Sequence, residues 1–425
     1  MNDIIQLAAL ATFAAAFAYM AMMAFREWRL TGHIAIREST ERERMRAEID
    51  EILERTRIRQ DKAEGAWSGF RKFRVAKKVL EADSVCSFYL EPHDGRPLPP
   101  FEPGQFLNFR LNIPDQPKPA LPCYSLSDCA RPDFYRVTIK RLGPPPSAPD
   151  VAPGVSSSHF HDQIEEGSII DVKAPKGQFY LNTTHHTPVV LVGGGIGITP
   201  VLSMLNHIVE SGSTRETWVF IGVRHGAEHV MKDHLKEIAA KYPNVKLVVM
   251  YSDPRDEDKL GDDYTEKGWV SVDLFKSMLP SNNYDYYFCG PPPMMNALFE
   301  GLREWDVPED NIHYEAFGPA TVGKKKEAQQ KVGDGPIEGA DPINVTFSRS
   351  GKTLKWNPSA DSLLQFALDN GVAIDHSCEA GNCGTCVVAL KSGELNYFSD
   401  PAEAPEPGTC YTCVTTPKGP IDIDA

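Results

Sequence analysis

The sequence predicts a multidomain protein with an N-terminal transmembrane helix, an antiparallel β-barrel, an α/β domain with a parallel sheet, and a small α+β domain. Its 425 residues are too many for one ordinary hydrophobic core. Short strand-forming runs broken by proline and glycine give way, near Thr187, to strands that alternate with helices. Five of the nine cysteines lie within residues 376–425, which indicates a separate C-terminal domain.

The N-terminal segment predicts a membrane anchor. Residues 4–25 carry no charge, a length that can cross the hydrocarbon core as a helix. Arg26 and Arg29 follow at once, so the positive-inside rule places the rest of the chain in the cytoplasm. A cleaved signal peptide would show the reverse asymmetry, and an amphipathic or packed helix is the other alternative. We expect an anchor over 1–30, a helical stalk over 31–66, and a single-pass protein of the inner (plasma) membrane.

Two fold patterns follow along the chain. Short strand-forming runs separated by turns predict an antiparallel barrel, and they cover residues 70–80, 87–90, 105–111, 124–127, 134–142 and 169–174. Apolar strands that alternate with helices then predict a parallel sheet covered on both faces. Its strands are expected at 189–192, 217–222, 246–251 and 284–288, with helices at 200–211 and 230–241.

A glycine-rich run marks a nucleotide site. Residues 193–200 read Gly-Gly-Gly-Ile-Gly-Ile-Thr-Pro, directly after a buried strand and at the start of a helix. Glycines let the backbone approach a diphosphate, and the helix N-terminus offers free N–H groups to it. The alternative is a tight turn without a ligand.

The C-terminal cysteines predict a metal cluster. Cys378, Cys383 and Cys386 have the C-x4-C-x2-C spacing of plant-type 2Fe–2S proteins, and Cys413 supplies a fourth thiolate. A disulfide set or a zinc site is the alternative, but zinc sites favour C-x2-C pairs and the run contains only one. Cys410 competes with Cys413 as the fourth ligand. His376 invites a centre with two histidine ligands, although four thiolates are already available.

Composition narrows the function further. The net charge of −14, without a basic cluster among aromatic residues, argues against nucleic-acid binding. Cysteines outside the last domain are scattered, which indicates a reducing compartment for the catalytic part. Residues 320–341 contain scarcely an apolar side chain and are expected to form a flexible linker to a final domain at 342–425.

Together these motifs resemble the ferredoxin–NADP reductase superfamily, arranged as in the reductase components of oxygenases. The resemblance implies an FAD-binding β-barrel over 67–184, an NAD(P)-binding domain over 185–319, and a plant-type 2Fe–2S ferredoxin domain of the β-grasp fold over 342–425. In that family a Tyr-Ser strand covers the flavin ring, and a Gly-x-x-Ser segment opens a helix on the flavin pyrophosphate. The matching residues here are Tyr124, Ser125, Leu126 and Ser127, and then Gly154, Val155, Ser156 and Ser157.

One position departs from the family. Where the family has an arginine two residues before the tyrosine, this chain has Pro122. Arg136 and Lys140 on the next expected strand are candidate substitutes as phosphate partners. We expect FAD rather than FMN.

The resemblance also assigns the nucleotide and catalytic residues. Gly194, Gly195, Gly197, Thr199 and Pro200 are expected to bind the dinucleotide, and Cys289, Gly290 and Pro291 to lie beside its nicotinamide. Ser125, Cys289 and Glu315 are the expected catalytic residues, with Phe317 at the contact between flavin and nicotinamide. Glu228 would bind an adenine-ribose diol and repel a 2′-phosphate, which favours NADH, whereas Arg224 would favour NADPH. We expect NADH.

The expected function is that of a membrane-anchored NAD(P)H-dependent flavin and iron–sulfur reductase. Electrons would pass from NADH to FAD, then singly through the 2Fe–2S cluster to an oxygenase, hydroxylase or desaturase. The alternative is a respiratory-type NADH dehydrogenase that reduces quinone or another lipid-soluble acceptor. The expected partners are therefore the membrane and either a redox acceptor protein or quinone, without nucleic acid.

Overall fold

The computed structural model describes most of the chain beyond residue 66. The described residues are 19–20, 22–23, 67–114, 116, 118–143, 153–185, 187–317, 343–376, 378–381, 384–399, 401 and 404–425. The expected stalk at 31–66 and linker at 320–341 lie outside this set. So does the expected anchor, except for residues 19–20 and 22–23, which are helical.

The predicted location in the inner membrane is wrong. Within the described part of the chain, no helix has the length and apolar character needed to span a bilayer. A span requires about 20 predominantly apolar residues in one helix. The prediction rested on the absence of charge over residues 4–25, most of which lie outside the described set. The membrane therefore lacks support as a partner.

The first sheet closes into an antiparallel barrel. Its six strands pair in the order β4-β3-β6-β1-β2-β5, and every pairing is antiparallel. Leu126, just beyond β4, forms a bridge to Val137 of β5, which joins the two outer strands. The elements are β1 (Arg71–Ala82), β2 (Val85–Pro92), β3 (Phe106–Arg110), β4 (Cys123–Ser125), β5 (Tyr135–Lys140), α2 (Val155–Gln163) and β6 (Ile169–Val172). Apolar side chains of the strands and Phe160 of α2 form one buried core.

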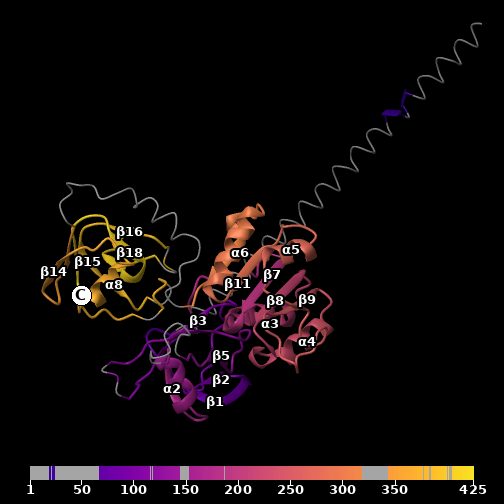
Figure 1. Ribbon diagram of the computed structural model, residues 1–425, viewed down its shortest axis with the longest axis horizontal. Coiled ribbons are helices and arrows are strands. Elements are labelled where there is room, and N and C mark those ends of the chain that lie inside the picture. Colours follow the sequence, from indigo (N-terminus) through magenta and orange to yellow (C-terminus); the bar gives the residue numbers. More distant parts are fainter. Residues whose placement is uncertain are drawn as a thin grey trace, which may run out of the picture. The chain divides into compact units, whose positions relative to one another are not determined.

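The second sheet is parallel throughout, with the order β10-β9-β8-β7-β11-β12. Its strands are β7 (Val189–Gly194), β8 (Thr217–Val223), β9 (Val245–Tyr251), β10 (Glu266–Lys267), β11 (Asp285–Cys289) and β12 (Ile312–Glu315). Its helices are α3 (Ile198–Glu210), α4 (Lys232–Lys241), α5 (Val272–Met278) and α6 (Pro292–Glu304). Figure 1 shows α3 and α4 on one side of the strands and α5 and α6 on the other. Two separate cores result, because successive residues of β7 point to opposite faces.

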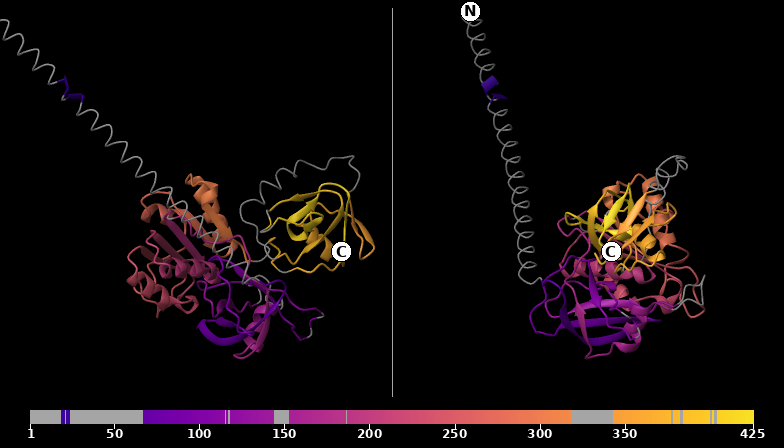
Figure 2. Two further views of the ribbon diagram at one scale, coloured as in Figure 1. Left: turned by 180° about the vertical axis from the view of Figure 1, so that it is seen from behind. Right: turned by 90° about the vertical axis from the view of Figure 1, so that its left-hand side faces the viewer.

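The C-terminal residues form a small mixed sheet of their own, drawn in yellow in Figure 2. Five strands pair in the order β14-β13-β19-β15-β17. The strands β16 and β18 form a separate two-stranded sheet. The elements are β13 (Asn344–Phe347), β14 (Lys352–Lys355), α8 (Leu363–Asp369), β15 (Val387–Ser392), β16 (Leu395–Tyr397), β17 (Thr409–Tyr411), β18 (Thr415–Pro417) and β19 (Ile421–Ile423). Ser362 caps α8 by accepting a hydrogen bond from the Gln365 N–H.

A buried polar seam joins the barrel to α3. The Asp128 carboxylate accepts a hydrogen bond from Asn206 Nδ2 at 2.9 Å, and its backbone carbonyl accepts one from the Ser203 hydroxyl at 2.7 Å. All three residues are buried. His234 of α4 contacts the other end of the Asn206 amide at 2.8 Å. The strand segment that follows Ser125 is thus tied to the helix that follows the glycine-rich turn.

Candidate functional site

The glycine-rich turn lies at the topological switch point of the parallel sheet. β7 has β8 on one side and β11 on the other. The strands that follow β7 therefore extend the sheet first on one side, through β8, β9 and β10, and then on the other, through β11 and β12. Gly193 of β7 pairs with Cys289 of β11, which brings the two expected nucleotide motifs side by side. A Cβ on Gly194 would lie 2.8 Å from Pro291 Cδ, and one on Gly197 would overlap the Cys289 carbonyl. Only glycines permit this approach, and the crevice they leave is where such sheets bind ligands.

The start of α3 is available for an anion. The short turn η1 (Gly195–Gly197) leads into α3, and no side chain caps the helix. Thr199 is buried and donates its hydroxyl hydrogen to the Ile196 carbonyl at 3.1 Å. Thr199 therefore supports the turn from inside, and the backbone N–H groups are what the turn offers to a diphosphate.

Ser125, Cys289 and Glu315 meet where the barrel touches the parallel sheet. Cys289 and Glu315 are paired across β11 and β12, and the Ser125 side chain lies near the Glu315 carboxyl group. All three are buried. Among the described residues, Glu315 Oε2 has no hydrogen-bond partner although it is buried. An unsatisfied buried oxygen is costly, so this position suits a ligand that donates a hydrogen bond.

Burial shifts the ionisation of both acidic groups at this contact. Loss of water raises the pKa of Glu315 to about 8, against the opposing effect of the nearby Ser125 side chain. Loss of water also raises the pKa of Cys289, and the nearby Glu315 carboxylate adds to the rise. Cys289 is therefore a neutral thiol at neutral pH and is not activated for nucleophilic attack.

The expected flavin strand divides into two parts. The Tyr124 ring lies edge-on to Phe160 at 5.3 Å and tilted against Phe109 at 5.8 Å, so the barrel holds it in place. Burial raises the pKa of its hydroxyl, which stays protonated. Leu126 and Ser127 are fully buried inside the barrel, and the Ser127 hydroxyl contacts Thr138 Oγ1 at 2.8 Å. The structure therefore brings Tyr124 and Ser125 to the site, while Leu126 and Ser127 serve the barrel core.

Helix α2 presents a second N-terminus. Gly154 precedes it, no side chain caps it, and its first turn carries no acidic residue. The Ser157 hydroxyl accepts from the Leu142 N–H at 3.1 Å and donates to the Gly154 carbonyl at 3.0 Å. It therefore fixes the entry to the helix, and the first N–H groups, including those of Val155 and Ser156, are what can meet a pyrophosphate.

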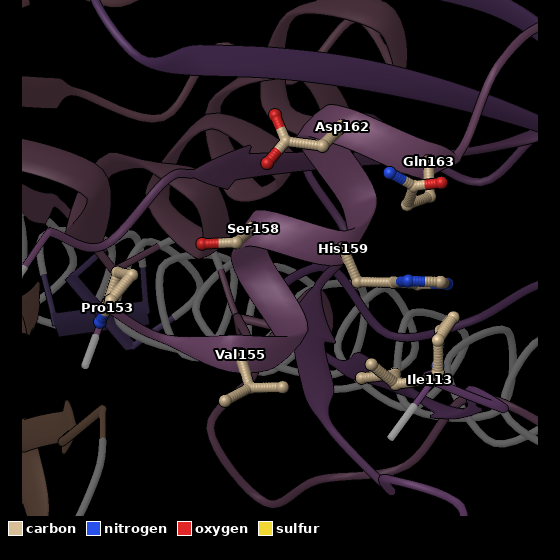
Figure 3. Close-up of a pocket in the computed structure, with 8 residues that line it drawn as sticks. Ile113, Pro153, Val155, Ser158, His159, Asp162 and Gln163 are labelled. Carbon is tan, nitrogen blue, oxygen red and sulfur yellow. The ribbon is translucent and has the colours of Figure 1, made fainter. Parts of the chain in front are cut away.

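A pocket of about 390 Å³ lies along α2. Figure 3 shows Val155, Ser158, His159 and Asp162 of the helix around it, with Ile113 facing them from the barrel. The Ser158 hydroxyl oxygen is buried and has no hydrogen-bond partner among the described residues. Burial lowers the pKa of His159, so its ring is neutral at neutral pH.

The two expected substitutes for the missing arginine have other partners. Arg136 is buried and bonds to the Ser127 carbonyl, with Asp128 at 3.6 Å. Lys140 reaches Glu228 of the nucleotide domain at 3.9 Å. Neither is therefore placed as a free phosphate ligand.

The expected coenzyme-selecting pair forms an ion pair. Arg224 and Glu228 bond to each other, and this bond lowers the pKa of Glu228. Phe317 is 41% exposed and ends the described part of the domain.

Three of the four expected cluster ligands are described, and Cys383 lies outside the described residues. Cys378, Cys386 and Cys413 are buried, and the Sγ atoms of Cys386 and Cys413 are 3.0 Å apart. The contact with Cys386 raises the pKa of Cys413. Crowded thiols of this kind suit a metal centre, because bound iron removes the cost of their ionisation.

The rest of the cysteine loop fits the same interpretation. Gly381 and Gly384 have φ values of +77° and +73°, the left-handed region that glycine adopts without strain. The ring of His376 contacts the Ile374 carbonyl at 2.8 Å and Glu379 at 3.7 Å. Cys410 is fully buried, and loss of water raises its pKa to about 12. Within the described part of the chain, the cysteines form no disulfide.

The seam of Asp128, Ser203 and Asn206 was missed by the sequence reasoning. A signal existed, because Ser203 and Asn206 are polar residues three positions apart in a helix whose middle is otherwise apolar. At that spacing they share one face. The partner on the barrel carries no such signal.

Comparisons with known proteins agree with this geometry. Residues 191–299 match the oxidoreductase NAD-binding domain family, and residues 345–418 match the 2Fe-2S iron-sulfur cluster binding domain family. A flavohemoprotein of Halalkalibacterium halodurans is 38% identical over 258 residues, which are 61% of this chain and 62% of that protein. The chain thus spans less than two thirds of that relative.

Two solved structures are also similar. One is the flavohem-like FAD/NAD binding domain of nitric oxide dioxygenase from Vibrio cholerae O1 biovar El Tor, with 27% identity and a TM-score of 0.53. The match covers 59% of this chain and 100% of the chain in that structure. The other is phthalate dioxygenase reductase, described as a modular structure for electron transfer from pyridine nucleotides to [2Fe-2S]. It has 27% identity and a TM-score of 0.52, and covers 84% of this chain and 98% of its own.

The predicted cofactors are confirmed by these similarities. The chain is an oxidoreductase with an NAD-binding domain and a 2Fe–2S domain, similar to electron-transfer reductases such as phthalate dioxygenase reductase, and it uses FAD, NAD and a 2Fe–2S cluster.

Proposed function

We propose that the protein is an NADH-dependent reductase that passes electrons through FAD and the 2Fe–2S cluster to an oxygenase-type partner. One observation carries the proposal. Ser125 of the barrel lies close enough to Glu315 of the nucleotide domain to influence its pKa, and Glu315 is paired with Cys289 at the switch point of the parallel sheet. A flavin in the barrel and a nicotinamide on the sheet would meet at this contact.

When bound, the cofactors supply the redox chemistry, which takes two electrons from a hydride donor and releases them one at a time. The protein positions them and keeps out water. Tyr124 is held by two aromatic neighbours where it can cover a flavin ring. Ser125, Cys289 and Glu315 are all buried, so the protein groups around this contact would admit little water. The orphaned Glu315 oxygen would accept a hydrogen bond from the bound pair.

Two details of cofactor choice belong to the same proposal. The uncapped start of α2 lies beside a pocket of about 390 Å³. This arrangement suits the pyrophosphate and adenosine end of FAD, and FMN has no such end. Glu228 already binds Arg224, so a 2′-phosphate would have to displace a carboxylate to use that arginine. This arrangement favours NADH.

The proposed acceptor follows from the kind of protein that the chain resembles. Phthalate dioxygenase reductase, which is described as a modular structure for electron transfer from pyridine nucleotides to [2Fe-2S], matches 84% of this chain. We infer that an oxygenase, hydroxylase or desaturase receives the electrons, as that relative's name indicates for its own dioxygenase.

Anaerobic titration with NADH, followed by absorbance and EPR, tests the proposal. Flavin bleaching followed by a rhombic EPR signal is the expected result. Cys413→Ser should keep flavin bleaching and lose both the signal and cytochrome c reduction. Cys410→Ser is the matched control, a buried cysteine three residues away, and should keep both. Iron-replete protein without an EPR signal would refute the proposal. Rapid turnover with quinone alone, without a protein acceptor, would favour the respiratory-type alternative.

A further inference from the structure

Trp269 is the most exposed large apolar side chain among the described residues, at 75%. A single exposed apolar residue needs no explanation by itself, so its position has to decide whether it has a role. Its neighbour Val270 is only 5% exposed. The chain therefore turns Val270 inward and leaves the adjacent indole in water.

The position of Trp269 is at the ligand-binding edge of the parallel sheet. Lys267 ends β10 and pairs in parallel with Tyr251, the last residue of β9. The Gly268 N–H then donates to the Tyr251 carbonyl at 2.9 Å. Trp269 thus follows the carboxyl end of β10 directly, and the carboxyl ends of parallel strands are where such sheets bind ligands.

The next residue turns back toward the middle of the sheet. A Cβ on Gly222 would lie 3.2 Å from Val270 Cγ2, so Val270 reaches the carboxyl end of β8. Arg224 follows β8 by one residue. The backbone of Trp269 therefore lies between the end of β10 and the strand that leads into the Arg224–Glu228 pair.

This backbone is held on both sides. Gly268 has a φ of +153°, and an added Cβ would touch Met250 Cε at 3.4 Å. After Val270, the Ser271 hydroxyl caps α5 by accepting from the Leu274 N–H at 3.2 Å. The indole is presented from a fixed backbone, which lowers the entropy that a ligand contact would cost.

We propose that the Trp269 indole is the surface on which the adenine ring of the nicotinamide coenzyme stacks. The proposal rests on the proposed use of NADH. The diphosphate has its place at the glycine turn after β7, and the nicotinamide lies toward Cys289 on β11. The strand order β10-β9-β8-β7-β11 then directs the adenosine the other way, over β8 and toward β9 and β10. Aromatic side chains commonly bind nucleobases by stacking on their flat faces.

ADP-ribose and reduced nicotinamide mononucleotide separate this role from the redox reaction. ADP-ribose carries the adenine without the nicotinamide, and the mononucleotide carries the nicotinamide without the adenine. The fluorescence of Trp269 is the difference in tryptophan emission between the wild type and Trp269→Phe. In the full-length holoprotein, ADP-ribose should quench this fluorescence, whereas the mononucleotide should leave it unchanged.

Affinity gives the second readout. Trp269→Ala should weaken ADP-ribose binding about tenfold in calorimetry, which corresponds to about 1.4 kcal/mol. It should raise the KM for NADH similarly with little change in kcat, and Trp269→Phe should restore most of the affinity. Trp305→Phe is the control. α6 begins just beyond the carboxyl end of β11, so Trp305 at the other end of this helix lies away from the ligand-binding edge, and the variant should bind ADP-ribose as tightly as the wild type.

Wild-type ADP-ribose affinity in Trp269→Ala would overturn the proposal. Loss of self-association in sedimentation with unchanged nucleotide binding would also overturn it and assign the indole to a second copy of the chain. Failure of the proposed function looks different, because the protein would then bind ADP-ribose through Trp269 and yet not oxidise NADH.

Discussion

At Glu315 the protein holds a carboxyl group away from water beside a thiol, and this moves its ionisation into the neutral range. The contact joins Ser125 to residues about 165 to 190 positions further along the chain. The residue types were available from the sequence through their motifs. Their meeting, and the unsatisfied Glu315 oxygen, depend on how barrel and sheet pack.

The first prediction concerns stability against pH. Burial raises the folded-state pKa of Glu315 from the usual 4.5 to about 8. A raised folded-state pKa contributes stability that is complete below the unfolded value and is lost as the pH rises through the folded value. The thermal midpoint of the holoprotein should therefore fall between about pH 4.5 and about pH 8. Glu315→Gln cannot ionise and should show a smaller fall; equal pH slopes would contradict the prediction.

The same group should affect the rate. Above pH 8 the carboxylate would stabilise the positive charge that develops on the nicotinamide ring, so stopped-flow flavin reduction by NADH should become faster. Glu315→Gln should keep the slow, low-pH rate throughout. A wild-type rate that is flat through this range would exclude an electrostatic role for Glu315.

Gly197 gives a prediction on the shape of the crevice. A Cβ there would overlap the Cys289 carbonyl, so Gly197→Ala has to push the two turns apart. We expect a loss of about 1–3 kcal/mol in unfolding free energy, together with a large loss of NADH-dependent flavin reduction. Gly212→Ala is the control, because Gly212 has a φ of +71° but an added Cβ there would have no atom within 4 Å. This variant should lose stability through backbone strain alone and should keep NADH-dependent flavin reduction. Equal effects on reduction would refute this explanation.

At the level of the elements, four strands and two helices of the nucleotide domain were predicted within a few residues. β7, β8, β9 and β11 lie where apolar runs predicted strands, and α3 and α4 where helices were expected. α5 and the two-residue β10 were not anticipated, because short elements carry too little periodicity to be recognised. The 13-residue α6, which begins with two prolines, was not anticipated either. Glu315 of β12 was assigned only through the resemblance to a known family.

The seam between β4 and α3 carries the element-scale prediction. Asn206→Ala leaves the buried Asp128 carboxylate without one of its donors, which should cost about 1–3 kcal/mol in unfolding free energy. It should also slow flavin reduction by NADH, because the strand of Ser125 loses a tie to the helix at the nucleotide crevice.

Asn244→Ala is the matched control. Asn244 donates to the Ser213 and Arg215 carbonyls, at 3.2 and 3.0 Å, within the nucleotide domain. It should lose similar stability and keep its rate of flavin reduction. If both variants slow reduction equally, the seam has no special part in positioning the barrel.

Over the whole molecule, the cluster thiols and the nucleotide crevice belong to different sheets with separate cores. Removal of iron should therefore lower the stability of the C-terminal domain and leave that of the nucleotide domain unchanged. Calorimetry should show the unfolding transition of residues 343–425 at a lower temperature, because metal binding contributes to the folding free energy of the domain that binds it. Flavin reduction by NADH should be unchanged. A uniform shift of all transitions would mean that the modules unfold as one unit.

The sequence by itself determined the features that depend on neighbours along the chain. These are the strand and helix periods, the glycine-rich turn after a buried strand, and the cysteine spacing that identifies the cluster domain. Uncharged length also suggested a membrane helix, and within the described residues no helix is long and apolar enough to span a membrane.

The tertiary structure alone decided which side chains share a site. It closed the barrel through Leu126 and Val137, turned Ser157 and Thr199 inward, and set Ser125 against Glu315. Local periodicity selects an element, but partners distant in sequence are chosen by burying apolar faces and satisfying buried polar atoms. Those requirements act only when the whole domain has packed.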